Sequence, residues 1–370
     1  MQQAIHSERL ERWLGAGYAE HLTRSMVGWY ADPIPVANVP GRVLVRADGD
    51  FEGKLLDGGR WSTLADKTIE RTIRFCERVW RREGGHLNAG FSSLNGLIQA
   101  ATAGQVQSYQ FNKAGPTGVV GASSSLWGVG NFPAAGAAAG AAPGGTATTS
   151  ATTGAFPLFN VSTAQQYFTT GWASASVGPN ILLLYDRLFH VTKTMSSSAT
   201  EAVTGTPSRY TNTSSGTADY IGGNFLFVEI GAALSATAHN WTTCLYTNQA
   251  GTTGQTVPSI TGNSSGIIWR LDQPTGQWFA PLATGDSGIK ALTQMQCSSA
   301  ALTGTINFVI GHPIAFLPCT VANLLGVADG VYSAFNLARI FDNACLAMME
   351  VTKAATTATT YSGQFQGVYG

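Results

Sequence analysis

Charged side chains are scarce in this chain. Only 11% of its 370 residues are Asp, Glu, Lys or Arg, against roughly 25% in an average soluble domain. The 21 basic and 21 acidic residues cancel, so the net charge is zero. This balance argues against nucleic-acid binding driven by overall positive charge. The surface must instead be built from Ser, Thr, Asn, Gln and Gly, which favour packed β-structure and long loops.

Long apolar runs and paired cysteines are also missing. No window approaches 18 uninterrupted apolar residues, so we expect no membrane-spanning helix. The opening residues, MQQAIHSERLERW, carry charges where a signal peptide has its apolar stretch, which predicts synthesis and assembly in a cytoplasm. The five cysteines lack the close spacing of zinc ligands, so we expect free buried thiols, no metal and no cofactor.

Catalytic motifs are lacking as well, and we expect that the protein is not an enzyme. Residues 285–288, GDSG, match the nucleophile tetrapeptide of chymotrypsin-like proteases, and His239 precedes them. However, Asp272 is the only acid between His239 and Asp286, and Ile289 stands where that family has a glycine. We therefore interpret the tetrapeptide as a turn.

Sugar binding without hydrolysis remains an alternative function. Trp241, Trp269, Trp278 and Tyr246 could form an aromatic platform, with Asn and Thr side chains supplying hydrogen bonds. Paired carboxylates for glycoside hydrolysis are not evident. The commoner outcome for such aromatic side chains is a place in the core or at an interface of a sandwich.

The charge that is present lies mostly at the N-terminus. Residues 1–90 hold 13 of the 21 basic and 12 of the 21 acidic residues, which predicts a small α+β domain over 1–90. Residues 41–56 indicate a hairpin around Asp48-Gly49. A helix should follow, capped by Ser62 or Thr63 and ended by Gly84-Gly85.

This predicted helix carries a stripe of cations at spacings of four and three residues. The stripe could bind an acidic partner, or it could be a solvated face on which Glu70 and Glu77 pair with basic neighbours. Without interleaved aromatic residues, it does not predict nucleic-acid binding. Its members are Lys67, Arg71, Arg74, Arg78 and Arg81.

Residues 91–176 are nearly uncharged, with Lys113 as the one ionised side chain. Their composition predicts an extended low-complexity arm or linker, most clearly over 134–154, AAGAAAGAAPGGTATTSATTG. Such a segment cannot build a core of its own. We expect a neighbouring surface, either another domain or another chain, to hold it in place.

Residues 177–353 predict an antiparallel β-sandwich, jelly-roll-like, so the fold class is mainly β. Its central strand is 181–194, ILLLYDRLFHVTKT, in which Arg187 and Phe189 should share one face and Leu188 and His190 the other. Both faces are mixed, which indicates partial cover on each side. Further strands are expected at 224–230, 242–247, 266–271, 277–282, 290–297, 304–310 and 345–353, with some helix over 320–343.

The last residues, 354–370, predict a second, C-terminal arm. They carry no charge after Lys353, and their aromatic side chains are Tyr361, Phe365 and Tyr369. An uncharged tail with three aromatic anchors suits contact with a neighbouring molecule.

Several phrases of the sequence resemble virion structural proteins of tailed bacteriophages. They are NILLLYDR at 180–187, GNFLF at 223–227, QWFAPL at 277–282 and GHP at 311–313. The resemblance implies a capsid decoration or cement protein that bridges major capsid subunits on the virion surface, assembles as a homotrimer in the host cytoplasm, and binds neither nucleic acid nor membrane. The alternatives are a major capsid protein, a tail or baseplate component, and a glycan-binding module.

Overall fold

The computed structural model describes residues 34–35, 42–43, 54–57, 60–63, 91, 93–159, 164–263, 266–300, 303–331 and 337–370. The chain divides into two compact units, Met1–Leu87 and Asn88–Gly370. The division lies close to residue 90, where the charge density of the sequence drops. Each unit is described by itself.

The described part of the first unit is a small antiparallel sheet in the order β1-β2-β3-β4. Val43 pairs with Leu55, which joins the two halves of the hairpin predicted over 41–56. Ser62 and Thr63, the predicted helix caps, lie in β4, and the helix expected after them lies outside the described residues. The strands are β1 (Ile34–Pro35), β2 (Arg42–Val43), β3 (Lys54–Asp57) and β4 (Arg60–Thr63).

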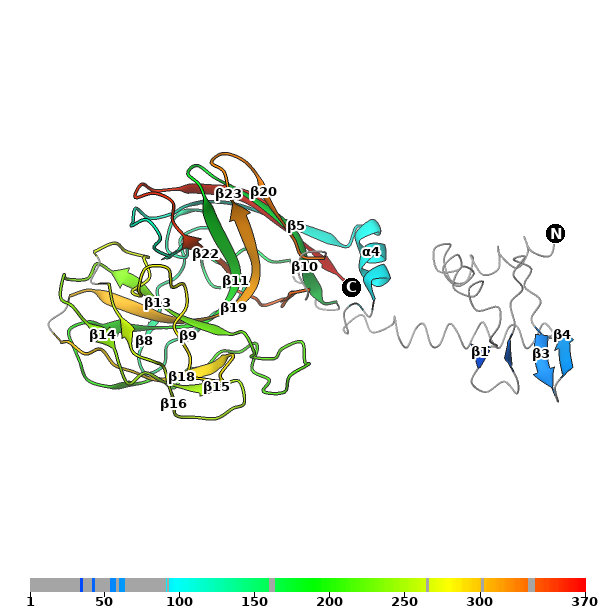
Figure 1. Ribbon diagram of the computed structural model, residues 1–370, viewed down its shortest axis with the longest axis horizontal. Coiled ribbons are helices and arrows are strands. Elements are labelled where there is room, and N and C mark those ends of the chain that lie inside the picture. Colours follow the sequence, from blue (N-terminus) through cyan, green and yellow to red (C-terminus); the bar gives the residue numbers. More distant parts are fainter. Residues whose placement is uncertain are drawn as a thin grey trace. The chain divides into compact units, whose positions relative to one another are not determined.

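The second unit is built mainly from antiparallel sheets, which confirms the predicted fold class (Figure 1). Sheet B has the strand order β20-β10-β23-β5-β7, and sheet C has the order β13-β19-β11-β22-β6. The sheet B strands are β5 (Val106–Ala114), β7 (Asn131–Phe132), β10 (Gln166–Ala175), β20 (Gly326–Asp329) and β23 (Thr360–Tyr369), with β21 (Arg339–Ile340) beside β10. The sheet C strands are β6 (Ser124–Ser125), β11 (Asn180–Thr194), β13 (Phe225–Ala232), β19 (Thr305–Cys319) and β22 (Leu346–Thr352).

A smaller sheet D, in the order β12-β18-β15-β16, completes the unit together with a two-stranded pair, β14-β17. One apolar core fills the space between sheets B and C, and a second joins sheet C to sheet D. The long strands β11 and β19 contribute to both cores and therefore connect the two halves of the unit. The remaining strands are β12 (Glu201–Ala202), β14 (Asn240–Trp241), β15 (Leu245–Asn248), β16 (Gln255–Thr256), β17 (Ile260–Thr261) and β18 (Ile289–Met295).

The predicted central strand is β11, but it is more buried than its sequence indicates. A third apolar cluster covers the face of sheet C opposite the first core, so most of β11 is buried on both sides. Its register with β19 shifts between Arg187 and Phe189. This irregularity interrupts the strict alternation predicted for the strand, and it brings Arg187 and His190 onto the same side, where Arg187 Nη2 lies 2.9 Å from His190 Nδ1.

The mixed character of β11 is explained by internal partners. Arg209 donates to both carboxylate oxygens of Asp186, at 2.8 and 2.6 Å, and Arg187 does the same to Glu229, at 3.2 and 2.6 Å. Both pairs are almost completely buried. Because an unpaired charge inside a protein is very costly, these pairs fix the loops and strands that carry the partners.

The described residues of 91–176 form no arm, which corrects the expectation drawn from their composition. They supply helix α4 (Leu94–Thr102), capped by Ser93, and they supply β5 and β10 of sheet B. The Gly/Ala-rich stretch also lies inside the unit, as β8 (Gly140–Ala141) and β9 (Thr146–Ala147), both paired with β11. Its own chain therefore holds it in place.

Small residues are needed there because the backbone approaches aromatic rings closely. A Cβ atom on Gly136 would lie 2.0 Å from the Trp127 ring, and one on Gly145 would lie 2.3 Å from the Phe189 ring. Gly145 also has a φ of +60°, which side-chain-bearing residues rarely adopt. A composition typical of a flexible linker is here a requirement of close packing.

The C-terminal residues are likewise part of the fold. β23 is an interior strand of sheet B, paired with β10 on one side and with β5 on the other. Residues 266–271 and 277–282, expected as strands, are irregular apart from bridges at Arg270 and Leu271. The described residues of 320–343 contain β20 and β21 in place of the expected helix.

Candidate interaction surface

The outward face of sheet B is an ordered array of uncharged polar side chains. Because successive residues of a strand point to opposite faces, Tyr109, Phe111, Tyr361 and Phe365 enter the core while their neighbours face outward. Cross-strand pairing places these neighbours in three rows. The rows are Asn112, Ser362 and Ser174; Gln110, Gln364, Trp172 and Val327; and Ser108, Gln366, Thr170 and Asp329.

The two outer rows are partly satisfied by hydrogen bonds within the sheet. Asn112 Nδ2 donates to Ser362 Oγ at 2.9 Å, and Gln366 Nε2 donates to Ser108 Oγ at 3.0 Å. Thr170 Oγ1 donates to the Ala328 carbonyl at 3.2 Å. These bonds fix the side chains at the margins of the face.

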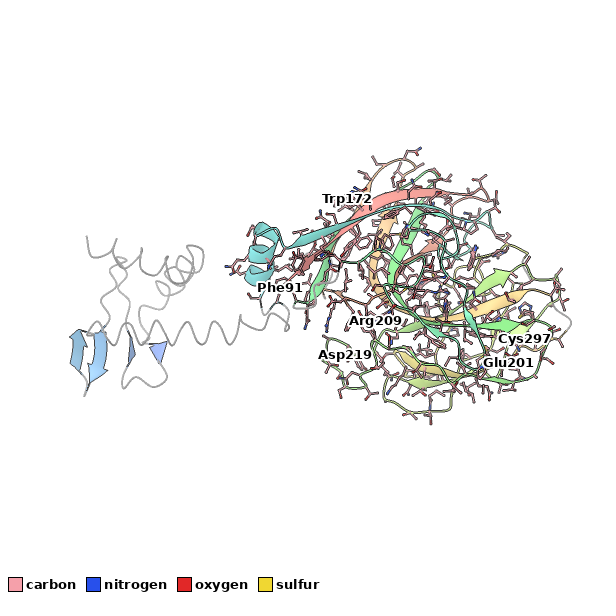
Figure 2. The ribbon with its side chains drawn as sticks, turned by 180° about the vertical axis from the view of Figure 1, so that it is seen from behind. Phe91, Trp172, Glu201, Arg209, Asp219 and Cys297 are labelled. Carbon is pink, nitrogen blue, oxygen red and sulfur yellow. The ribbon has the colours of Figure 1, made fainter. Side chains whose placement is uncertain are left out.

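The middle row differs because its polar side chains have no such partners among the described residues. Within the described part of the chain, the side chains of Gln110, Gln364 and Trp172 make no hydrogen bond or ring contact. Gln110 is exposed, and Gln364 and Trp172 are partly exposed. Figure 2 shows Trp172 at the outer margin of the unit. This row therefore offers amide groups and an indole ring to a ligand.

A second surface feature, which we call the apolar ridge, consists of Val321, Leu324, Leu325 and Val327. Their side chains are 54%, 58%, 59% and 63% exposed. The first three lie in the loop between β19 and β20, and Val327 lies in β20, at the end of the sheet B strand order. Grouped exposed apolar residues at a sheet edge are typical of an interaction site.

A groove runs beside the ridge. It is lined by Ile314 and Phe316 of β19 and by Val327 and Ala328 of β20. The same stretch of β19 also lines a wider cavity of about 680 Å³ that contains Tyr210, His312 and Arg339. Burial lowers the pKa of His312 to about 4, so its imidazole is neutral at pH 7.

Two of the three tail aromatics predicted to contact a partner are core residues. Tyr361 and Phe365 are fully buried between sheets B and C, and the Tyr361 hydroxyl donates a hydrogen bond to Glu350. This corrects their assignment to a surface arm, because a strand paired on both sides turns every second side chain inward. Tyr369 is partly exposed.

The five cations predicted to bind an acidic partner lie outside the described residues, so that assignment stays a prediction. They are Lys67, Arg71, Arg74, Arg78 and Arg81. Four cysteines, Cys244, Cys297, Cys319 and Cys345, are buried free thiols as predicted, and Cys76 lies outside the described residues.

The GDSG tetrapeptide and the four aromatic residues of the possible sugar platform have structural roles. Gly285 lies in a turn with a φ of +93°, which confirms the interpretation of GDSG. Asp286 accepts hydrogen bonds from the Tyr246 hydroxyl at 2.5 Å and from Asn248 Nδ2 at 2.7 Å. Trp241 and Tyr246 are buried in the core, so the four aromatics do not assemble into an exposed platform.

The His239 and Asp272 side chains do meet. His239 Nε2 lies 2.8 Å from Asp272 Oδ2, and Trp241 Nε1 donates to the same oxygen at 2.8 Å. Burial alone would lower the pKa of His239, but the hydrogen bond and charge of Asp272 raise it. Ser287 binds elsewhere, through its backbone N–H, to Gln249 Oε1 at 3.0 Å.

The described residues contain neither a cluster of metal ligands nor a membrane-spanning helix. No three His, Cys, Asp or Glu side chains of that part of the chain gather in a way that could hold a metal ion. None of its helices has the length and apolar character needed to cross a membrane.

Sequence comparison gives no match to any family model or to any curated protein. Comparison of the fold gives weak matches to structures of infectious bursal disease virus. The Gx strain structure has a TM-score of 0.16 and 9% identity, covering 71% of this chain and 80% of that chain. The VP2 subviral particle has a TM-score of 0.14 and 10% identity, with coverages of 71% and 79%. This is weak structural similarity to a viral capsid protein, too distant to carry an argument.

The outward face of sheet B was not predicted from the sequence. A signal was present, because residues 106–114 and 360–369 alternate aromatic with amide or hydroxyl side chains, the pattern of a strand with one buried face. The rows themselves could not be derived, since they depend on pairings such as Val106 with Val368, far apart in the sequence.

Proposed function

We infer that this chain is a structural, non-catalytic component of a virus particle, of the capsid decoration type, in which the β-sandwich unit forms a homotrimer. The observation that carries the proposal is the apolar ridge at the edge of sheet B. The resemblance of the sequence to virion proteins of tailed bacteriophages supports the same role. Major capsid subunits would be the further partner.

The ridge supports self-association on energetic grounds. Full burial of a Val or Leu side chain is worth roughly 1.5–3 kcal/mol. Because the four ridge side chains are more than half exposed, covering all of them would gain on the order of 4–6 kcal/mol. A closed ring of copies would cover the ridge of every subunit and leave no exposed apolar edge to which further copies could bind.

The buried charge pairs suit a structural component that must resist mechanical force. The Arg187–Glu229 and Asp186–Arg209 pairs and the Lys353–Glu350 pair all lie in or beside sheet C. Breaking any of them would leave a charge without a partner in the interior, which is strongly unfavourable. A unit held in this way resists partial opening, as a shell under internal pressure requires.

Sedimentation velocity of the purified full-length chain tests the proposal. We expect a trimer at micromolar concentration, and we expect Leu325→Glu to weaken the trimer by at least tenfold, because the new carboxylate must be desolvated on association. Val120→Glu is the matched control, since Val120 is 54% exposed but lies outside the ridge.

Either of two results would count against the proposal. A wild-type chain that stays monomeric at tens of micromolar would remove the self-association on which the trimer rests. A Leu325→Glu variant that remains trimeric would show that the ridge is not the contact. Circular dichroism of each variant establishes that the fold is retained.

A further inference from the structure

We propose that the outward face of sheet B binds a neutral glycan, with Trp172 as the stacking platform and with Gln364 and Gln110 as hydrogen-bonding groups. This site differs from the aromatic set Trp241, Trp269, Trp278 and Tyr246 considered from the sequence. It shares one residue with the trimer contact proposed above, because Val327 belongs to the ridge and also ends the middle row beside Trp172.

The geometry of the face suits a chain-like ligand. Adjacent strands lie about 4.8 Å apart, and outward-facing residues of one strand repeat at about 6.7 Å. Gln110, Gln364, Trp172 and Val327 follow one another across four strands in a single row. The row therefore presents hydrogen-bonding and stacking groups at regular steps, on a surface where every second position of each strand points outward.

The chemistry of the face selects an uncharged, hydroxyl-rich ligand. In the three rows, Asp329 at the edge is the one ionisable side chain, and Lys113 of β5 is buried with its Nζ donating to the Val129 and Ala134 carbonyls. No cation is therefore available in these rows for phosphate, nucleic acid or an acidic peptide. Amide and hydroxyl groups, by contrast, match the donors and acceptors of sugar hydroxyls.

Trp172 supplies the second element of sugar recognition. An indole ring has a negative face and attracts the polarised C–H groups on the apolar side of a pyranose ring. Trp172 lies mid-strand, with Gln364 on one side and Val327 on the other. A ligand that stacks on the ring would hold its hydroxyl groups over the amide of Gln364, which has no partner among the described residues.

A second copy of this chain is the competing occupant of the face. The outward face of sheet B in a second copy would carry the same amides and hydroxyls and one tryptophan. A contact between two such faces would therefore bury little apolar area. The unpaired amides of the middle row would have to find partners in register across the interface, or remain desolvated without hydrogen bonds. A mobile polyhydroxylated ligand meets this requirement more readily.

The test is isothermal titration calorimetry of the full-length chain with neutral gluco-, galacto- and manno-oligosaccharides. Heparin fragments serve as the charged comparison. We expect at least one neutral series to bind and heparin not to bind. Trp172→Ala and Gln364→Ala should each weaken binding about fivefold, the change in affinity that corresponds to about 1 kcal/mol for a stacked ring or a hydrogen bond.

Cross-controls separate this proposal from the trimer. Leu325→Glu should leave oligosaccharide affinity within about twofold, and Trp172→Ala should leave the sedimentation coefficient unchanged. Binding that is absent from all neutral series, or unaffected by both face substitutions, would overturn the proposal. Loss of the trimer in Trp172→Ala would also overturn it, because the face would then be a subunit contact. Should Trp172→Ala fail to fold, Gln364→Ala and Gln110→Ala decide.

Discussion

Replacing Glu229 with Gln should strongly destabilise the β-sandwich unit, because it leaves the Arg187 guanidinium buried without a counter-charge. Arg187 donates to both carboxylate oxygens of Glu229, and Asn307 Nδ2 donates to the same group at 3.1 Å. Burial alone would lower the pKa of Arg187, but the charge of Glu229 raises it. The guanidinium stays charged after the substitution as well, because arginine does not lose its proton in proteins.

The magnitude follows from burial. Arg187 and Glu229 are both completely inaccessible to solvent, and removing one partner of a buried pair costs about 3–5 kcal/mol. The other groups around the guanidinium, His190 Nδ1 and the Tyr185 hydroxyl, are neutral and cannot replace the lost charge. For a unit of this size we expect the melting temperature to fall by roughly 10 °C.

Calorimetric melting of the full-length protein measures the effect. Asp219→Asn is the control, because it makes the same kind of change at a partly exposed carboxylate with no side-chain hydrogen bond among the described residues, and it should shift melting little. The double variant Arg187→Met with Glu229→Leu should recover much of the loss, since it removes both charges. A Glu229→Gln variant that melts within 2 °C of the wild type would refute the reasoning.

Three further predictions concern the fold. Deleting residues 360–370 should abolish cooperative melting of the unit, because β23 is paired on both sides; a truncated chain that melts normally would show that the tail is dispensable. Gly145→Ala should lower the free energy of unfolding, measured in urea, by about 1–3 kcal/mol, because Gly145 has a positive φ and a Cβ there would meet the Phe189 ring. Gly144→Ala is the control and should be nearly neutral, because a Cβ on Gly144 meets nothing within 4 Å. Burial lowers the folded-state pKa of His312 to about 4, below the unfolded value near 6.5, so stability should fall as pH drops from about 6.5 to 4. His312→Gln should flatten that part of the melting profile, and parallel profiles would exclude His312 as the cause.

The sequence was informative wherever local pattern and burial agree. The apolar runs that open β11 and fill β22 predicted strands correctly, and the charge boundary near residue 90 lies close to the division after Leu87. Low charge and frequent turn signals predicted the β class. In each case the feature depends on a few neighbouring residues, which is the range over which propensity acts.

The other features could not be predicted, because they depend on pairing between strands that are far apart in the sequence. Residues 134–154 have the composition of a linker, and only the rings of Trp127 and Phe189 show why glycine is required at Gly136 and Gly145. The tail likewise has no local sign that β5 and β10 will enclose it. The outward face of sheet B depends on the same distant pairings, so its middle row could be recognised only once the strand order was known.

The copy number of this chain in purified virus particles tests the proposed role in the virion most directly. Quantitative mass spectrometry should find the chain in particles at many copies, in a fixed ratio to the major shell protein and in multiples of three per lattice position. Absence of the chain from particles, or its presence only in infected-cell extract, would contradict a structural role in the virion.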